Sequence, residues 1–286
     1  MTQSVTVEPK TSSENVAFKT ITATRVTPHV GAEISGVDLT KPLSKEQVAE
    51  LTKALETYLV LFFRDQHISI ENLVSTTLNF GELHHPPALQ PYALKDYPGV
   101  LELRIDANTK KIPGEAWHSD MSCDPEPPLG SILYLHTVPE VGGDTMFASM
   151  YAAYDALSDK MKQHLEGLTA IHDASNTLAG VVPPDTILPR SSHPVIRTHP
   201  VTGRKTIYVS EVFTTRIEGV SKAESKALLQ FLAQHVQEPE FQCRFRWQPH
   251  SIAFWDNRSV QHQAIFDYYP NLRSGFRTQI VGEKPF

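Results

Sequence analysis

Apolar residues recur with two different spacings along this chain, and the first quarter shows both. Residues 44–47 read Ser-Lys-Glu-Gln, a capping-box sequence that is typical of a helix N-terminus. An apolar stripe at helical spacing follows it, formed by Val48, Leu51, Leu55 and Tyr58. Residues 59–63 are then continuously apolar, which predicts a short strand buried on both faces.

Most of the remaining elements are predicted to be short strands. Alternating residues indicate early strands within 18–34, and further strands are expected at 100–105, 131–135, 195–198, 206–209, 242–247, 251–255, 259–266 and 276–281. Helices are predicted at 69–80, 149–167 and 221–235, and long loops at 86–98 and 174–192. Many short strands with few helices predict a mainly β fold (α+β), a closed or double-sheet core with flanking helices packed outside.

Composition narrows the class of protein. With 286 residues and 40% apolar content, we expect a single domain over residues 17–286 after a disordered leader at 1–16. A net charge of −6 argues against nucleic acid as the main partner. No apolar run approaches the roughly 20 residues that cross a bilayer, and the leader has no signal segment. Cys123 and Cys243 form no zinc-type spacing and no disulfide framework, so we expect a cytoplasmic protein.

The most informative chemistry lies at His118 and Asp120. Trp117 and a turn at residues 110–114 indicate the entry to a strand, where residues two apart project to the same side. Both side chains could therefore reach one metal ion. An imidazole and a carboxylate are two-thirds of the set that holds Fe(II) in non-haem oxygenases, which needs one more histidine.

A second histidine–acid pair, His164 and Glu166, has a different context. Apolar residues around it recur at helical spacing, and on a helix residues two apart point to nearly opposite sides. We therefore expect this pair to bind no metal.

The third ligand can be sought among histidines followed eleven residues later by arginine. The chain has three such pairs, His193/Arg204, His235/Arg246 and His262/Arg273. The spacing cannot choose between them, but the context can. His235 ends an amphipathic helix and His193 precedes a proline in a loop, whereas His262 is flanked by core strands.

Two arginines close to His262 suggest an anionic ligand. In a strand Arg273, Gly275 and Arg277 share a face, and the glycine would leave space between the guanidinium groups. Because a buried charge without a partner is costly, a carboxylate- or sulfonate-bearing ligand is expected there.

Taken together, these motifs resemble one family, the taurine dioxygenase/TfdA-type Fe(II)- and 2-oxoglutarate-dependent dioxygenases. The similarity runs over roughly residues 21–285. It rests on Trp117-His118-Ser119-Asp120, Gly142-Gly143-Asp144-Thr145, Phe213-Thr214-Thr215-Arg216-Ile217, Trp255-Asp256-Asn257 and the segment from His262 to Arg277.

The resemblance implies a double-stranded β-helix (jelly-roll) core, an oxidoreductase activity and a dimer or tetramer. It implies Fe(II), 2-oxoglutarate and O2 as cofactor and cosubstrates, with succinate and CO2 as products. It assigns the metal to His118, Asp120 and His262, and 2-oxoglutarate to Arg273 and Thr145. For the primary substrate it points to Arg277, Phe213, His85 and Leu178.

The substrate itself stays open at this point. In residues 83–87 the histidine that would contact taurine is shifted or replaced by proline, so His85 is only a stand-in, and Leu178 stands near a phenylalanine position of the taurine pocket. Sulfonates such as taurine, alkyl sulfates and phenoxyalkanoates all remain candidates. Two other functions share features with this reading: a cupin-like Zn or Mn isomerase or hydrolase, and a non-catalytic module that binds small anions. The first of these gives no reason for the paired arginines.

Overall fold

A large antiparallel sheet forms one half of the core in the computed structural model, which describes residues 16–109, 114–179 and 182–286. The strands follow the order β1 (Thr22–Arg25), β2 (Ala32–Ser35), β3 (Val60–Phe63), β14 (Ser251–Asp256), β6 (Gly130–Thr137), β16 (Arg273–Ile280), β5 (Tyr97–Ile105) and β4 (Ala93–Leu94). Among the strands that the structure describes, only β2 and β3 pair in parallel. Of the predicted site residues, Arg273 and Arg277 lie on β16 of this sheet.

A second, three-stranded sheet faces the first. It has the order β13 (Gln242–Phe245), β7 (Thr145–Ser149) and β15 (Val260–Ala264). Large side chains from both sheets fill the space between them; the Phe62 and Phe245 rings stack with their centroids 4.0 Å apart. Two sheets around one apolar core make the double-stranded β-helix, so the predicted fold class is confirmed.

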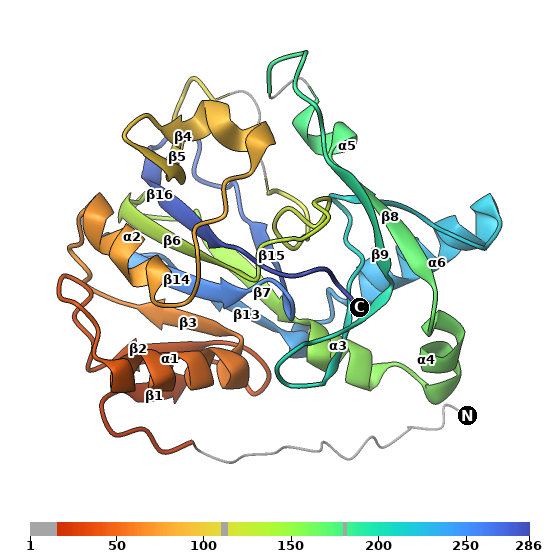
Figure 1. Cartoon of the computed structure of the whole chain (residues 1–286), viewed down its shortest axis with the longest axis horizontal. Coiled ribbons are helices and arrows are strands. Elements are labelled where there is room, and N and C mark those ends of the chain that lie inside the picture. The colour runs from red at the N-terminus through yellow and green to blue at the C-terminus, as the bar shows by residue number, and fades with distance from the viewer. Residues whose placement is uncertain (1–15, 110–113, 180–181) are drawn as a thin grey trace.

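Two helices cover the outer face of the large sheet, α1 (Lys45–Tyr58) and α2 (Ile70–Leu78) (Figure 1). Both begin at a capping box, formed by Ser44 with Gln47 and by Ser69 with Asn72, as the sequence predicts for the first. Leu51, one residue of the apolar stripe, is fully buried against the sheet. Its burial contributes roughly 1.5–3 kcal/mol to the free energy of folding. These helices leave the inner face of the sheet to the site.

A peripheral layer extends the fold on the other side (Figure 1). It contains the sheet β12–β8–β9 (Thr214–Ile217, Thr169–Asp173, Arg190–Pro194) and the hairpin β10–β11 (Ile196–Thr198, Lys205–Ile207). The helices α3 (Met150–Ala156), α4 (Asp159–Leu165), α5 (Ser175–Leu178) and α6 (Lys222–His235) and the short 3₁₀ helix η2 (Pro239–Phe241) complete it. A second 3₁₀ helix, η1 (Pro87–Tyr92), lies instead beside β5 of the large sheet.

Several predicted boundaries need correction. The helix expected at 149–167 is two helices, because Leu157 is extended and Ser158 caps a new helix. The expected loop at 86–98 holds η1 and β4, and the one at 174–192 holds α5 and the start of β9. Strands β8 and β12 were not predicted. The turn expected at 110–114 falls mostly, and the leader almost entirely, outside the described residues.

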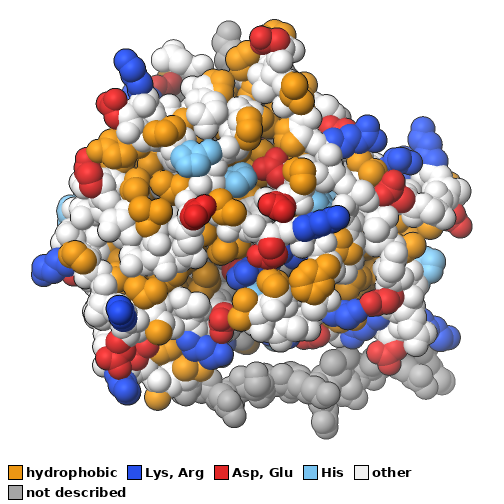
Figure 2. Space-filling model, viewed as in Figure 1, with side chains coloured by type: hydrophobic (Ala, Val, Ile, Leu, Met, Phe, Trp, Pro, Cys, Tyr) orange, Lys and Arg blue, Asp and Glu red, His pale blue; other side chains and the backbone are white. Residues whose placement is uncertain are grey.

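Charges of both signs are spread over the face of the molecule seen in Figure 2, with apolar side chains between them. They do not gather into one basic patch on that face, in keeping with the net charge of −6. Across the part of the chain that the structure describes, no helix is both long and apolar enough to cross a membrane.

Candidate metal centre

A pair of backbone hydrogen bonds brings the first and last candidate ligands together. The His118 amide donates to the His262 carbonyl at 3.1 Å, and the His262 amide donates back at 2.8 Å. This single bridge replaces the regular strand expected around His118. Asp120 lies in the turn that follows, where Met121 has a positive φ of 46°. The strand prediction was therefore wrong in extent, yet the two side chains do face the same point.

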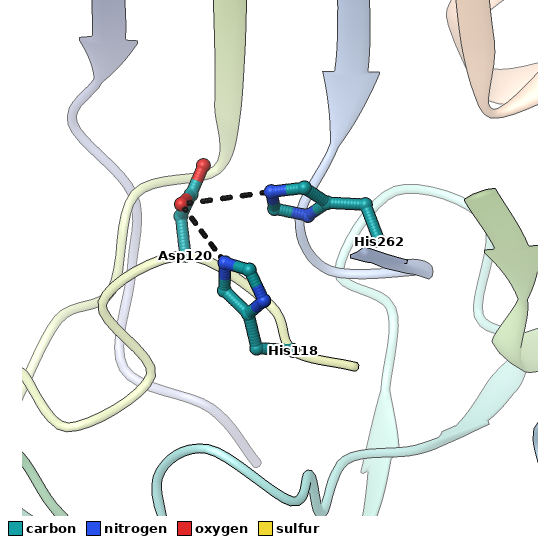
Figure 3. Close-up of side chains that lie close together, drawn as sticks. All are labelled: His118, Asp120 and His262. Atoms are coloured by element: carbon teal, nitrogen blue, oxygen red, sulfur yellow. Dashed lines mark ion pairs between the residues drawn. The ribbon is translucent and has the colours of Figure 1, made fainter. Parts of the chain in front are cut away.

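The three candidate side chains converge as Figure 3 shows. Asp120 Oδ1 lies 3.8 Å from His118 Nε2 and 3.9 Å from His262 Nε2. All the donor atoms lie within 4.8 Å of one another, and all three residues are buried. These separations are too long for hydrogen bonds and leave room for an ion between the donors. The structure thus assembles the set that the sequence proposed.

Both imidazoles are prepared to offer a nitrogen lone pair. Burial lowers the pKa of His118 and, together with the neighbouring His118 ring, lowers the pKa of His262 to about 3. Each ring is therefore uncharged at neutral pH. His118 Nδ1–H donates to the Ala116 carbonyl at 2.8 Å, which leaves Nε2 free for a metal.

The carboxylate of Asp120 is ionised and held from two sides. Burial by itself would raise the pKa of Asp120, but the Arg277 guanidinium holds it well below its usual value. Ser131 Oγ–H donates to Oδ2 at 2.6 Å, and Arg277 Nη1–H donates to Oδ1 at 2.9 Å. Oδ1 is left facing the histidines.

Two residues that sequence reasoning missed fix this orientation. Asn257 accepts from the Asp120 amide at 3.2 Å and from the Trp255 indole at 2.9 Å, and its own amide donates to Ser131 Oγ at 3.0 Å. Ser131 and Asn257 therefore form a buried bracket around the carboxylate. The motif Trp255-Asp256-Asn257 pointed to this region, but only the pairing of β14 with β6 brings Asn257 beside Ser131.

A buried cation lies deeper in the site. Arg273 is 3% exposed, and its Nη2 donates weakly to Thr145 Oγ1 at 3.4 Å. Trp247 also donates to that hydroxyl, at 2.9 Å, and its ring lies under the guanidinium. Arg273 Nε has no partner, and no ion pair joins Arg273 to a carboxylate among the described residues. The side chain is thus built to receive an anion.

The glycine between the two arginines has a different role from the expected one. A Cβ at Gly275 would lie 2.0 Å from the Tyr134 carbonyl oxygen, at the bulge where β16 shifts register against β6. Gly275 is thus required by the close approach of two backbones. It does not serve to separate the guanidinium groups.

A cavity of about 280 Å³ opens from the three donors. Thr145, Arg273, Arg277, Phe213 and Leu178 all line it, as the resemblance implies. His85 does not: it is exposed and packs beside Gly99, while its neighbour His84 contacts Asp124. The expectation that His85 contacts the substrate is therefore not supported by its position.

The alternative histidines lie elsewhere. His164 is on α4, and Glu166 is exposed and pairs with Lys205. His193 is hydrogen-bonded to the Asp124 carbonyl and His235 to the Ala153 carbonyl. Within the described parts of the chain, one group of three or more His, Cys, Asp or Glu side chains is arranged to hold a metal, and it is the group at His262.

The donor chemistry fits a specific metal class. Two neutral imidazoles and one carboxylate on one side of a cavity match the facial set of non-haem Fe(II) enzymes, which leaves three coordination positions for other molecules. A structural zinc site is a poorer match, because such sites use four protein donors and this group has three.

Known proteins place this arrangement in a family. The family model described as "Taurine catabolism dioxygenase TauD, TfdA family" matches residues 22–279. An alkylsulfatase of Acinetobacter baylyi is 32% identical over 91% of this chain and 84% of its own. An α-ketoglutarate-dependent 2,4-dichlorophenoxyacetate dioxygenase of Cupriavidus pinatubonensis is 32% identical, over 85% and 91%. The crystal structure of a taurine dioxygenase from Burkholderia xenovorans superimposes with a TM-score of 0.82 at 34% identity, covering 93% of each chain. The chain belongs to the TauD/TfdA family and is a 2-oxoglutarate-dependent (α-ketoglutarate-dependent) dioxygenase.

Proposed function

We propose that His118, Asp120 and His262 hold Fe(II) in this dioxygenase. The observation that carries the proposal is the convergence of their three donor atoms in the lining of the cavity. When bound, the iron lets O2 oxidise a substrate C–H bond while 2-oxoglutarate is converted to succinate and CO2. The protein residues supply binding, orientation and the exclusion of water.

Arg273 and Thr145 are the residues proposed to bind the distal carboxylate of 2-oxoglutarate. The guanidinium is almost completely buried and has an unused Nε–H, so a carboxylate would satisfy both its charge and its donors. Trp247 fixes the Thr145 hydroxyl from behind. This arrangement would orient the cosubstrate with its 2-oxo acid end toward the iron ligands.

The primary substrate is proposed to be a small organic anion that undergoes hydroxylation. Arg277 lines the cavity beside Asp120 and would bind the anionic group. Arg104, which also lines the cavity, is paired with Asp106. The relatives support this class, since their names refer to alkyl sulfates, a phenoxyacetate and the sulfonate taurine. The two segments at 86–98 and 174–192 place Leu89 and Leu178 over the cavity, where they would exclude water.

Substrate-dependent succinate formation tests the ligand assignment. Asp120→Ala should abolish it, because Asp120 supplies the carboxylate in the described group of three candidate donors. His164→Ala is the matched control, since it removes the histidine of the other His-x-acid pair on exposed α4. Normal turnover in Asp120→Ala would remove this residue from the mechanism.

Measuring O2 consumption distinguishes the proposed dioxygenase from the two alternative functions, a metal-dependent isomerase or hydrolase and an anion-binding module. A Zn- or Mn-dependent isomerase or hydrolase would act without O2 or 2-oxoglutarate, and an anion-binding module would show no turnover after reconstitution with iron. Family membership argues against both. The cytoplasmic location, the dimer or tetramer and the single domain at 17–286 stay predictions.

A further inference from the structure

The outer wall of the cavity is a separate apolar cluster. It joins two segments that lie at the same end of the molecule in Figure 1, one carrying η1 and the other α5. Six of the cluster's residues also line the cavity: Leu89, Leu101, Met121, Leu178, Val212 and Phe213. A substrate group that reaches this wall meets hydrocarbon and an aromatic ring.

The acidic side chains of the cavity are unsuited to bind an ammonium group. Asp120 accepts from Arg277 on one oxygen and from Ser131 on the other. The second acidic residue among the described lining is Glu102, which is exposed. Because neighbouring residues of a strand point to opposite faces, Glu102 points away from the face that Leu101 presents to the apolar wall. The cationic side chains Arg273 and Arg277 lie within the same cavity and would repel an ammonium.

These two observations restrict the substrate class, an inference that rests on the proposed function. We propose that this chain oxidises anions with an apolar alkyl or aryl tail, and that it discriminates against anions, such as taurine, whose tail ends in an ammonium. The anionic head, a sulfate, sulfonate or carboxylate, lies with Arg277. The tail lies against Leu178 and Phe213. An ammonium placed there would lose its hydration without gaining a free carboxylate partner among the described lining residues.

Taurine and propane-1-sulfonate form a matched pair, because a methyl group replaces the ammonium in molecules of nearly equal size. Substrate-dependent succinate formation should give propane-1-sulfonate a kcat/KM about a hundredfold higher or more. Pentane-1-sulfonate should gain about fourfold more for each added methylene until the cavity is filled. The corresponding alkyl sulfates and carboxylates, tested in parallel, identify the preferred head.

A wall variant tests whether the tail lies where we place it. Leu178→Ala should flatten the dependence of kcat/KM on chain length while leaving the KM for 2-oxoglutarate unchanged. Leu78→Ala, the same change on an exposed leucine of α2, should leave both unchanged. Circular dichroism tests whether Leu178→Ala is folded, and the comparison of the two sulfonates on the unmodified enzyme does not depend on this variant.

The outcomes separate this inference from the proposed function. If taurine equals or exceeds propane-1-sulfonate, the inference is overturned but the dioxygenase assignment stands. If no anion stimulates succinate formation and the iron–2-oxoglutarate absorption band does not form under anaerobic conditions, both are overturned. An unchanged chain-length dependence in folded Leu178→Ala would reject the placement of the tail.

Discussion

Arg277 donates a 2.9 Å hydrogen bond to Asp120 Oδ1, the same carboxylate oxygen that faces both histidine rings. The candidate substrate-binding cation and the candidate metal ligand are therefore in direct contact. The Arg277 side chain is 24% exposed, so it is open to the cavity as well. A metal bound to Oδ1 would interact with Asp120, and an anion bound in the cavity would interact with Arg277. Each would therefore compete with the ion pair between these two residues.

Replacing Arg277 should affect substrate binding more than metal binding. In Arg277→Met the anionic head loses a charge-assisted hydrogen bond of about 1.5–3 kcal/mol, so the KM for the primary substrate should rise about 10- to 100-fold. Iron affinity should not fall, because Oδ1 is released from a competing donor. Steady-state kinetics and anaerobic metal titration measure the two effects. A collapse of metal affinity with an unchanged KM would show that the residue only supports Asp120.

The buried bracket formed by Ser131 and Asn257 should matter for metal affinity. Ser131→Ala removes the donor to Asp120 Oδ2 and lets the carboxylate rotate, so affinity for Fe(II) or Mn(II) should fall about 10- to 100-fold. Asn257→Leu should have a similar effect through the Asp120 amide and Ser131. Equilibrium dialysis under anaerobic conditions provides the measurement.

Ser119→Ala is the control for that series. Ser119 is buried beside the same ligands, but its hydroxyl donates to the Val260 carbonyl and not to the carboxylate. Its affinity for metal should stay close to that of the unmodified protein. Equal losses in Ser119→Ala and Ser131→Ala would mean that any lost buried hydroxyl disturbs the site, and the orienting role would be rejected.

Patterns within one segment of the sequence predicted the helices and strands that are specified by residues of that same segment. The capping box at Ser44, the buried strand at 60–63 and the helix at 222–235 follow from spacing and side-chain type within one segment. The three candidate metal donors that the structure brings together were also named from the sequence, because His118 and Asp120 are close in sequence and His262 stands in a recognisable motif.

What the sequence could not predict depends on contacts between distant segments. Gly275 is explained by the Tyr134 carbonyl of another strand, and Ser131 becomes part of the site only through its pairing with Trp255 of β14. Strands β8 and β12 were missed because apolar and polar residues alternate weakly in both, and β12 pairs with β8 across more than 40 residues. The role expected for His85 is not supported for a similar reason, since only the folded chain shows that His85 is exposed and outside the described lining of the cavity.

Stability should fall as the pH is lowered below 6.5, and His172 should account for part of the loss. Burial lowers the pKa of His172 to about 3 from its ordinary 6.5, so the unfolded chain binds a proton that the folded chain does not. The free energy of unfolding therefore falls with decreasing pH through the window between these values. Between pH 7.5 and 5.5 the loss is about 1.4 kcal/mol for this one group.

Urea denaturation of the metal-free protein at the two pH values measures this effect. His172→Gln should reduce the pH-dependent loss by about 1.4 kcal/mol, whatever its effect on stability at pH 7.5. His29→Gln, which replaces an exposed histidine, should leave the loss unchanged. If His172→Gln retains the full loss, the proton is taken up elsewhere on unfolding.

Arg273 should show opposite effects on cosubstrate binding and on the stability of the ligand-free protein. Its guanidinium is buried, burial lowers its pKa, and its Nε has no partner, so the folded chain bears the cost of desolvating a cation. In Arg273→Met this cost is removed, and the metal-free protein should be as stable as the unmodified one or more stable, by up to about 4 kcal/mol.

Binding of 2-oxoglutarate to Arg273→Met should instead weaken about 10- to 100-fold, because the carboxylate loses its charged partner. Thermal unfolding and the anaerobic absorption titration measure these two quantities, and Arg273→Lys, which keeps the charge without the fork, should bind with intermediate affinity. Destabilisation of Arg273→Met with unchanged 2-oxoglutarate binding would identify the arginine as a structural residue that the core requires.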